Sequence, residues 1–134
     1  MDNNWIYFGV FLDDESRNKL NDLALEVIQS DWKVYCHHMT IAFNDGSEKS
    51  QNAYNAYKKH FGKVTDIYAT HIGISDDAAA VKVYFKQGTL TNFPHVTLAT
   101  PQGGKPVNSN YITEWYELKT PIKLSGIIKS FNKK

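Results

Sequence analysis

The amino-acid sequence predicts an α+β fold with largely antiparallel sheets, flanking helices and a central cleft. Its segments predict the order strand, helix, strand, helix, several strands, helix, strand, which is typical of α+β proteins. Each half of the chain ends its core with a strand of the same five-residue pattern, which indicates two similar lobes. No linker or low-complexity run interrupts the 134 residues, so we expect a single domain over residues 1–134.

The first expected strand and helix follow from residue type and spacing. Residues 5–12 are mostly aromatic or aliphatic and contain Gly9, which predicts a strand buried on both faces. The stretch DDES, residues 13–16, provides a cap and a negatively charged first turn for a helix. Apolar residues then recur at helical spacing, namely Leu20, Leu23, Ala24, Val27 and Ile28.

A second strand and a second helix complete the first half. Residues 32–43 predict a strand that is broken or bent near Cys36. NDGSEKS, residues 44–50, predicts a turn and a helix cap. Tyr54, Tyr57 and Phe61 then form an aromatic stripe on a helix of about 12 residues.

The second half changes to a period of two. Residues 67–71 and 79–85 predict paired strands, and the loop KQGTLTN separates them from a strand at 93–100. TPQGGKPVNSN, residues 100–110, is the most turn-rich stretch of the chain. We expect a helix to begin near Ser109–Asn110 and to carry residues 111–118, and a last strand at 122–131.

Composition restricts the possible partners and the compartment. A net charge of +1 provides no general field for a long nucleic acid, so a nucleic-acid ligand should be small or held locally. Cys36 is the one cysteine and cannot form an internal disulfide, which favours a reducing, cytoplasmic compartment. Residues 1–16 match neither a signal peptide nor a membrane span. We expect no membrane association and see no sign of a stable protein partner.

Two segments carry most of the functional information. HMTIA begins at His38, and HVTLA begins at His95, 57 residues further on. Alternate side chains of a strand share a face, so His38, Thr40 and Ala42 point one way, and the small Ala keeps that face open. Met39 and Ile41 point the other way. His95, Thr97 and Ala99 repeat this pattern. Opposed across a cleft, the two strands would supply two imidazoles and two hydroxyls.

Those four groups suit in-line cleavage of a phosphodiester. The attacking oxygen needs a base and the leaving oxygen an acid, and His has an unperturbed pKa suited to both roles. Thr hydroxyls are short donors that can hold the non-bridging oxygens. A zinc site is less favoured, because no carboxylate lies at ligand spacing from either His. Cys36 is near His38, but it is expected on the opposite face of the strand. A chance repetition of His-x-Thr is the remaining alternative.

The paired HMT and HVT segments resemble the 2H phosphoesterase superfamily. The resemblance covers the whole chain in size and motif order, and it implies two αβ lobes around a cleft. It also implies that His38 and His95 are the acid–base pair, that Thr40 and Thr97 bind phosphate, and that no metal or other cofactor is needed. The residues do not decide which His is the base.

The segment after the second motif resembles the corresponding loop of the RNA-repair branch of that superfamily. Lys105 could reach a phosphate, and Ser109 and Asn110 could place a helix N-terminus toward an anion. Capping explains Ser109 and Asn110 equally well. Tyr7 could line the cleft and stack on a base, although such a residue more often belongs to a core.

The resemblance implies a nucleotide phosphodiester as substrate. It leaves two classes open, a 2′,3′-cyclic phosphate at an RNA end and a cyclic di- or oligonucleotide signal. The second class would fit a viral enzyme with an anti-defence role in the host cytoplasm. From a different functional class, a protein that binds a nucleotide without cleaving it stays open as the alternative.

Overall fold

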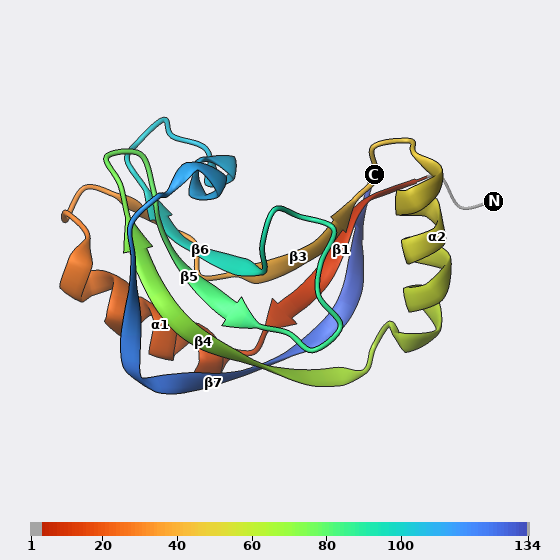
Figure 1. The fold of residues 1–134 in the computed structure, drawn as a ribbon, viewed down its shortest axis with the longest axis horizontal. Helices are drawn as coiled ribbons and strands as arrows, with labels where there is room; N and C mark the ends of the chain where they lie inside the picture. Colours follow the sequence, from red (N-terminus) through yellow and green to blue (C-terminus); the bar gives the residue numbers. More distant parts are fainter. Residues whose placement is uncertain (1–3, 134) are drawn as a thin grey trace.

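The computed structural model describes residues 4–133 and confirms a mixed α+β fold in which the strand pairings are antiparallel (Figure 1). The elements in chain order are β1 Trp5–Leu12, α1 Asp14–Val27, β2 Lys33–Val34, β3 His38–Phe43, α2 Glu48–Tyr57, η1 Lys58–His60, β4 Val64–Ile74, β5 Ala79–Tyr84, β6 His95–Thr100, η2 Pro106–Tyr111 and β7 Trp115–Asn132.

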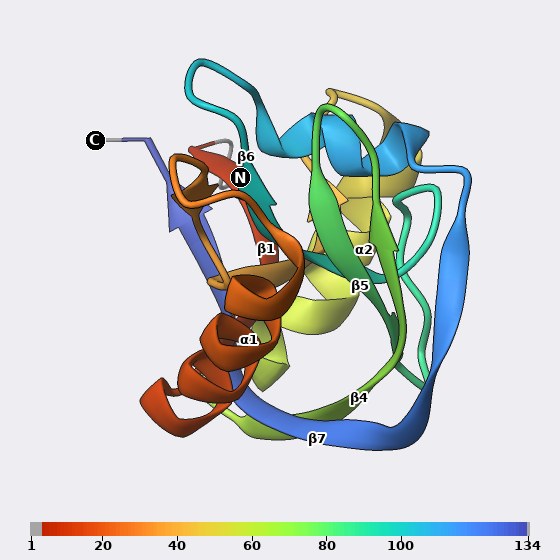
Figure 2. The same cartoon turned by 90° about the vertical axis from the view of Figure 1, so that its left-hand side faces the viewer.

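All of the strands belong to one sheet, in the order β2-β6-β3-β1-β7-β4-β5. A further pairing between β5 and β6 closes the sheet, so that β6, β3, β1, β7, β4 and β5 form a ring of six strands. The short strand β2 pairs with β6 and lies outside this ring. Figure 2 shows the long, curved β4 and β7 side by side on the lower side of the molecule. Hydrogen bonding alone does not divide this sheet into the two lobes that we predicted, and that division stays a prediction.

Both helices have the predicted caps. Asp13 accepts a hydrogen bond from Ser16 N at the start of α1, and Ser47 Oγ accepts one from Ser50 N at the start of α2. Helix α1 packs against β6 and β7, where Ser16 Oγ accepts a bond from Ser125 N at 2.7 Å. The α2 helix ends at Tyr57 and continues as η1, so Phe61 lies beyond the helix.

The predicted bend near Cys36 separates β2 from β3. Cys36 has a φ of 48°, a conformation that side chains other than Gly and Asn seldom adopt. Strand β2 and the bend both bond to β6, since Tyr35 N and Cys36 N donate to Leu98 O and Thr97 O. The register with β6 shifts by two residues across this bend, because Val34 pairs with Ala99 while Met39 pairs with Val96.

Strand β1 differs from the prediction that both of its faces are buried. Phe8, Val10 and Leu12 are buried, but Ile6 is exposed and Tyr7 and Phe11 are half-buried. Gly9 lies against Thr40 at a bulge in the β1–β3 pairing, and a Cβ there would lie 2.1 Å from Met39 O. A larger residue would therefore part these two strands.

The predicted helix at residues 111–118 is wrong. The 3₁₀ helix η2 occupies 106–111, and from Trp115 the chain is the long strand β7, paired with β4 and β1. Pro121 lies inside β7, where the pairing with β4 is irregular. Its missing N–H is tolerated at such a position.

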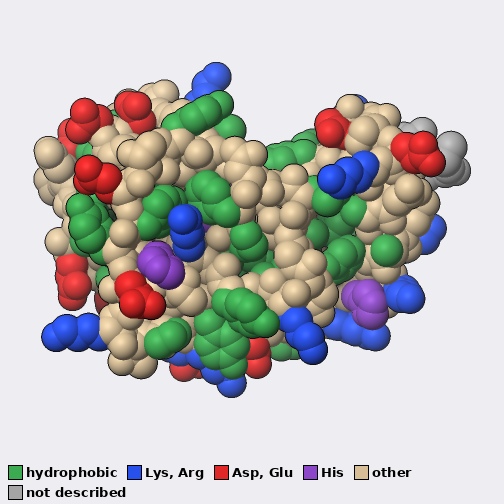
Figure 3. Space-filling view, in the orientation of Figure 1, with side chains coloured by type: hydrophobic (Ala, Val, Ile, Leu, Met, Phe, Trp, Pro, Cys, Tyr) green, Lys and Arg blue, Asp and Glu red, His purple; other side chains and the backbone are tan. Residues whose placement is uncertain are grey.

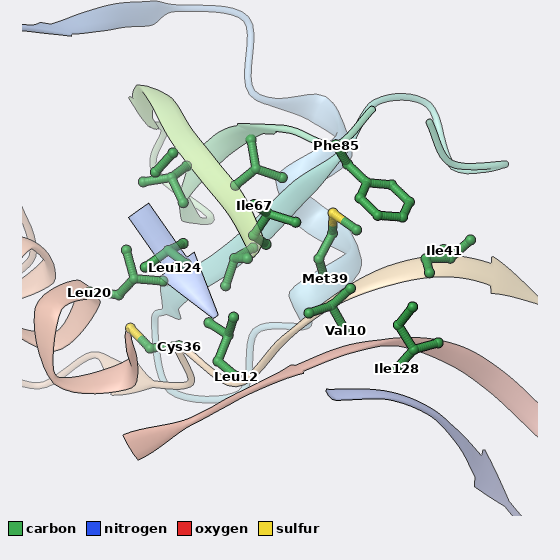
Figure 4. Packing of buried hydrophobic residues seen from close by; sticks show 14 of the residues in the cluster. Val10, Leu12, Leu20, Cys36, Met39, Ile41, Ile67, Phe85, Leu124 and Ile128 are labelled. Atoms are coloured by element: carbon green, nitrogen blue, oxygen red, sulfur yellow. The ribbon is translucent and has the colours of Figure 1, made fainter. Parts of the chain in front are cut away.

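The core fills the space between the ring of strands and the two helices. Figure 4 shows Val10, Met39, Ile67 and Leu124 from four different strands in this cluster, with Leu20 of α1 beside Cys36. The inward faces of β3 and β6 contribute Met39, Ile41, Val96 and Leu98, all buried. Burying these side chains leaves the opposite faces of β3 and β6 for the site.

Candidate active site

The register of β3 and β6 brings the two His-x-Thr segments together. Met39 pairs with Val96, and both point into the core. In an antiparallel pair this register sets His38 beside Thr97 and Thr40 beside His95, all four on the face away from the core. The four residues are half-buried, as expected for a cleft wall.

These side chains line a cavity of about 550 Å³. Figure 3 shows the surface hollowed between two shoulders on the side where β3 and β6 lie in Figure 1. The wall includes β1, β3, β6, η2 and the loops that precede β3 and β6. Its lining residues are Tyr7, Tyr35, His37, His38, Thr40, Phe43, Thr91, His95, Thr97, Lys105, Pro106, Val107 and Asn110.

His38 is held in an aromatic stack. Its ring is stacked on Tyr7 and Phe11, with ring centroids 4.8 and 5.4 Å apart. Its Nδ1 lies 3.0 Å from Nδ1 of His37, so one of these two nitrogens donates a hydrogen bond to the other. Burial, followed by the neighbouring imidazoles of His37 and His95, lowers the pKa of His38 to about 4. His38 is therefore neutral at pH 7.

His95 is held differently. Its Nδ1 donates to Phe93 O at 2.9 Å, which leaves Nε2 as the nitrogen free for proton transfer. The Phe93 ring packs against His95 with centroids 5.0 Å apart. Burial lowers the pKa of His95, while the hydrogen bond to Phe93 O opposes this shift because it favours the cation.

The hydroxyl of Thr97 is linked to η2. Thr97 Oγ1 lies 2.8 Å from Ser109 Oγ and donates to Pro106 O at 3.3 Å. Ser109 is fully buried and lies outside the cavity lining, so its hydroxyl reaches the site through Thr97.

The remaining predicted site residues, Tyr7, Lys105 and Asn110, line the cavity. Tyr7 lines the cavity, and its ring already stacks on His38, Phe11 and Phe131. Lys105 and Asn110 line the cavity on the η2 side. Asn110 Nδ2 donates to Val107 O at 3.2 Å, while its Oδ1 is buried and has no hydrogen-bond partner within residues 4–133.

Two expectations about small residues fail. Ala42 and Ala99, which we expected on the open side of their strands, are fully buried and do not line the cavity. The bulge between β1 and β3 skips Ile41 in the register and turns Phe43 toward the cavity. Phe43 remains 54% exposed beside Tyr7, and it offers an accessible aromatic surface at the site.

Sequence reasoning also missed Tyr35, Thr91 and Val107, and His37 lies outside the His-x-Thr pattern on which it relied. Thr91 Oγ1 donates to Phe93 O, the same carbonyl that orients His95. The doubled His in HHMT was a usable signal that a second imidazole lies near His38. The others come from loops, where no periodicity marks a site.

Positive charge surrounds His37. Arg17 donates from Nε to Cys36 O at 3.2 Å and from Nη2 to Tyr35 O at 3.4 Å. Lys129 lies over the Phe11 ring at 4.8 Å. Burial lowers the pKa of His37, and the charges of Arg17 and Lys129 lower it further, so this imidazole too is neutral at pH 7.

Neither a metal centre nor a membrane-crossing helix is found among the described residues. Within residues 4–133, no cluster of three or more His, Cys, Asp or Glu side chains is arranged to hold a metal ion. Over the same range, none of the helices combines the length and the apolar character that crossing a membrane requires.

Comparison with known proteins identifies a similar fold. No protein-family model matches this chain, and neither does any curated protein sequence. A solved structure described as a fungal RNA kinase is similar, with a TM-score of 0.71 and 13% sequence identity. The similarity covers 99% of this chain but 46% of the fungal chain, so this chain spans less than half of that structure. At 13% identity, this similarity shows a shared fold and not a shared activity.

Proposed function

We propose that this protein is a phosphodiesterase that cleaves a nucleotide phosphodiester by acid–base catalysis with His38 and His95. The observation that carries the proposal is the pairing of Met39 with Val96, which sets both His-x-Thr segments into one cavity. Two imidazoles provide both proton transfers, so the mechanism does not require a metal ion. In this proposal the strands carrying the two motifs belong to the two lobes of a 2H phosphoesterase-like domain.

His38 is the general base and His95 the general acid in this mechanism. Neutral His38 accepts a proton from the attacking water through Nε2 as the new P–O bond forms. The bond to the leaving ribose oxygen breaks, and that oxygen takes the proton from Nε2 of His95. The Phe93 carbonyl stabilises the His95 cation, and the negative substrate raises both histidine pKa values on binding. Proton exchange with water then restores both residues.

His37 keeps His38 in the tautomer that a base requires. If His38 Nδ1 carries the proton and donates to His37 Nδ1, the lone pair of His38 lies on Nε2, toward the substrate. A charged His37 would instead donate to His38 and place the proton of His38 on Nε2. Arg17 and Lys129 oppose that state because they disfavour a positive charge on His37.

Thr40 and Thr97 hold the non-bridging phosphate oxygens. The cross-strand register puts each hydroxyl beside the imidazole of the other segment, so a phosphate between the histidines contacts both. The buried Ser109 hydroxyl orients Thr97, and Lys105 adds positive charge to the cavity wall. Phe43 or Tyr7 contacts the base or sugar, with Phe43 the more accessible of the two.

The substrate is either a 2′,3′-cyclic phosphate at an RNA end or a cyclic di- or oligonucleotide. The fold of an RNA kinase supports RNA end processing. Kinase activity itself is not proposed, because the sequence lacks a G-x4-GK[ST] phosphate-binding loop and spans less than half of that structure. If the substrate is a cyclic nucleotide signal, the protein would act against a host defence that uses that signal.

A product assay in EDTA tests the proposal. The substrates are a 2′,3′-cyclic-phosphate oligoribonucleotide, a 2′,5′-linked dinucleotide, and cyclic dinucleotides with 3′,5′ and 2′,5′ bonds. We expect the wild type to cleave at least one of them, and His38→Ala and His95→Ala each to lose activity by about 10²–10⁴-fold. The control is Tyr116→Phe, an exposed residue outside the cavity.

Two results would contradict the proposal. Equal cleavage by the wild type and both histidine variants would exclude the acid–base pair. No cleavage, with a raised melting temperature in the presence of one ligand, would support the alternative of a nucleotide-binding protein without catalytic activity.

A further inference from the structure

A second cavity lies at the end of α2. It has a volume of about 430 Å³, and its wall includes Lys59, His60 and Lys63. Tyr57, Thr65 and Gln87 add polar groups, and within residues 4–133 no Asp or Glu lines it. In Figure 3, Lys and His side chains gather at the lower right, near the turn between α2 and β4 of Figure 1.

The basic groups of this cavity are uncompensated. Ion pairs among residues 4–133 join Lys19 to Glu15 and Lys123 to Asp66, so neither Lys59 nor Lys63 has an ion-pair partner in the described chain. Because the whole protein has a net charge of +1, this cluster is a local concentration of positive charge. Such a cluster attracts an anionic ligand.

The backbone that carries these side chains is well fixed. Gly62 has a φ of 92° and closes the turn after η1. Gly62 N donates to Ile128 O at 2.7 Å, and Ile128 N donates to Lys63 O at 3.0 Å, so β7 supports the turn. Lys59 belongs to η1, and these bonds set the backbone position of Lys63 before any ligand binds.

One loop separates this cavity from the candidate active site. Phe85 and Gln87 line the second cavity, and Thr91 lines the first. Leu90 N donates to Ile41 O at 2.8 Å and anchors the loop to β3. Lys86, which is exposed, lies between the two residues that line the second cavity. A ligand that leaves the first cavity across this loop meets positive charge along its path.

We propose that the second cavity binds the phosphate backbone of a linear RNA whose end occupies the first cavity. The inference rests on the proposed function and narrows its substrate class. A cyclic dinucleotide holds both phosphates in one compact ring and would fill the first cavity alone. A linear oligoribonucleotide continues beyond it, and its backbone phosphates match the unpaired ammonium groups of Lys59 and Lys63.

Length-dependent binding tests this inference. The probes are a single-stranded RNA of about eight nucleotides and a dinucleotide, both with a terminal phosphomonoester that the enzyme does not cleave. Binding is measured by fluorescence anisotropy at several salt concentrations. Lys59→Ala/Lys63→Ala is compared with Lys49→Ala/Lys119→Ala, which removes the same charge at exposed positions outside both cavities.

We expect Lys59→Ala/Lys63→Ala to weaken binding of the longer RNA by about tenfold, the effect of removing two exposed ammonium groups that bind phosphate, and to leave the dinucleotide unaffected. The salt dependence of log K should decrease by about 0.7 for each phosphate that the variant no longer neutralises. An equal effect in the control variant, an equal effect on both probes, or no effect would each overturn the inference.

Cleavage measured in parallel separates this inference from the proposed function. If both lysine variants cleave a short substrate normally and bind the longer RNA as the wild type does, the second site is wrong and the phosphodiesterase stands. If nothing is cleaved but length-dependent binding requires Lys59 and Lys63, the RNA site stands and the catalytic proposal fails.

Discussion

The state of His38 can be tested through the pH dependence of stability. Its pKa is lowered from 6.5 to about 4 in the folded protein, chiefly by burial. Below pH 6.5 the unfolded chain therefore binds a proton at this residue that the folded chain does not. The free energy of unfolding therefore decreases as the pH is lowered. The loss begins near pH 6.5 and is complete below about pH 4.

The magnitude follows from the size of the shift. One pKa unit corresponds to about 1.4 kcal/mol, so the difference between 6.5 and about 4 gives ~2 kcal/mol at pH 5 and ~3 kcal/mol at pH 4. Domains are commonly stable by about 5–15 kcal/mol, so the effect is measurable by urea unfolding.

The comparison uses His38→Gln, which cannot titrate. Carboxylates and the other histidines also respond to pH, and subtracting the variant curve from the wild-type curve isolates most of the His38 contribution. Thr40→Val is the matched control, since it changes the same cavity without removing a titrating group, and its curve should parallel that of the wild type. Parallel curves for His38→Gln and the wild type between pH 7 and pH 4 would refute the argument.

Three further predictions follow from single contacts. His37→Phe removes the acceptor for His38 Nδ1 and should lower kcat by roughly fivefold, which corresponds to the loss of one hydrogen bond of about 1 kcal/mol. His37→Asn keeps an acceptor and should retain most of the activity. Equal losses in the two variants would contradict the tautomer argument. Gly9→Ala places a Cβ 2.1 Å from Met39 O and should lower the Tm by roughly 10 °C, as measured by circular dichroism. An unchanged Tm would show that β1 and β3 can separate without a loss of stability. Burial raises the pKa of Cys36 to about 12, so a thiol reagent should modify it only in urea; rapid modification of the native protein would contradict its burial.

The sequence predicted most of the strands and the motif residues because both depend on local patterns. Residues 67–71 alternate with a period of two, and they pair as β4 with β5 and β7. The bend near Cys36 was visible as an interruption of an apolar segment. Both His-x-Thr segments were placed on strands, and alternation alone was enough to put Met39 and Val96 in the core.

What failed depends on contacts between distant residues. Tyr111, Trp115 and Leu118 recur at helical spacing, but pairing with β4 makes residues 115–118 part of β7, so tertiary contacts override the local pattern. Ala42 is buried because of a bulge that no local pattern indicates. His37 was recognisable as a histidine at the site, but its contact with His38 Nδ1 depends on the turn at Cys36.

The junction between β3 and β6 has a consequence for motion. In the described chain, Met39 with Val96 is the one residue pair in the register of these strands, and a little further along β3 the backbone bonds to Leu90 in the loop instead. Elsewhere the ring is joined by long pairings, such as β4 with β7. The ring of strands is therefore held by the fewest backbone pairings at the place where the two His-x-Thr segments lie side by side. Opening at this junction breaks few backbone hydrogen bonds, so the cleft can widen for a ligand while the long pairings keep the rest of the ring in shape.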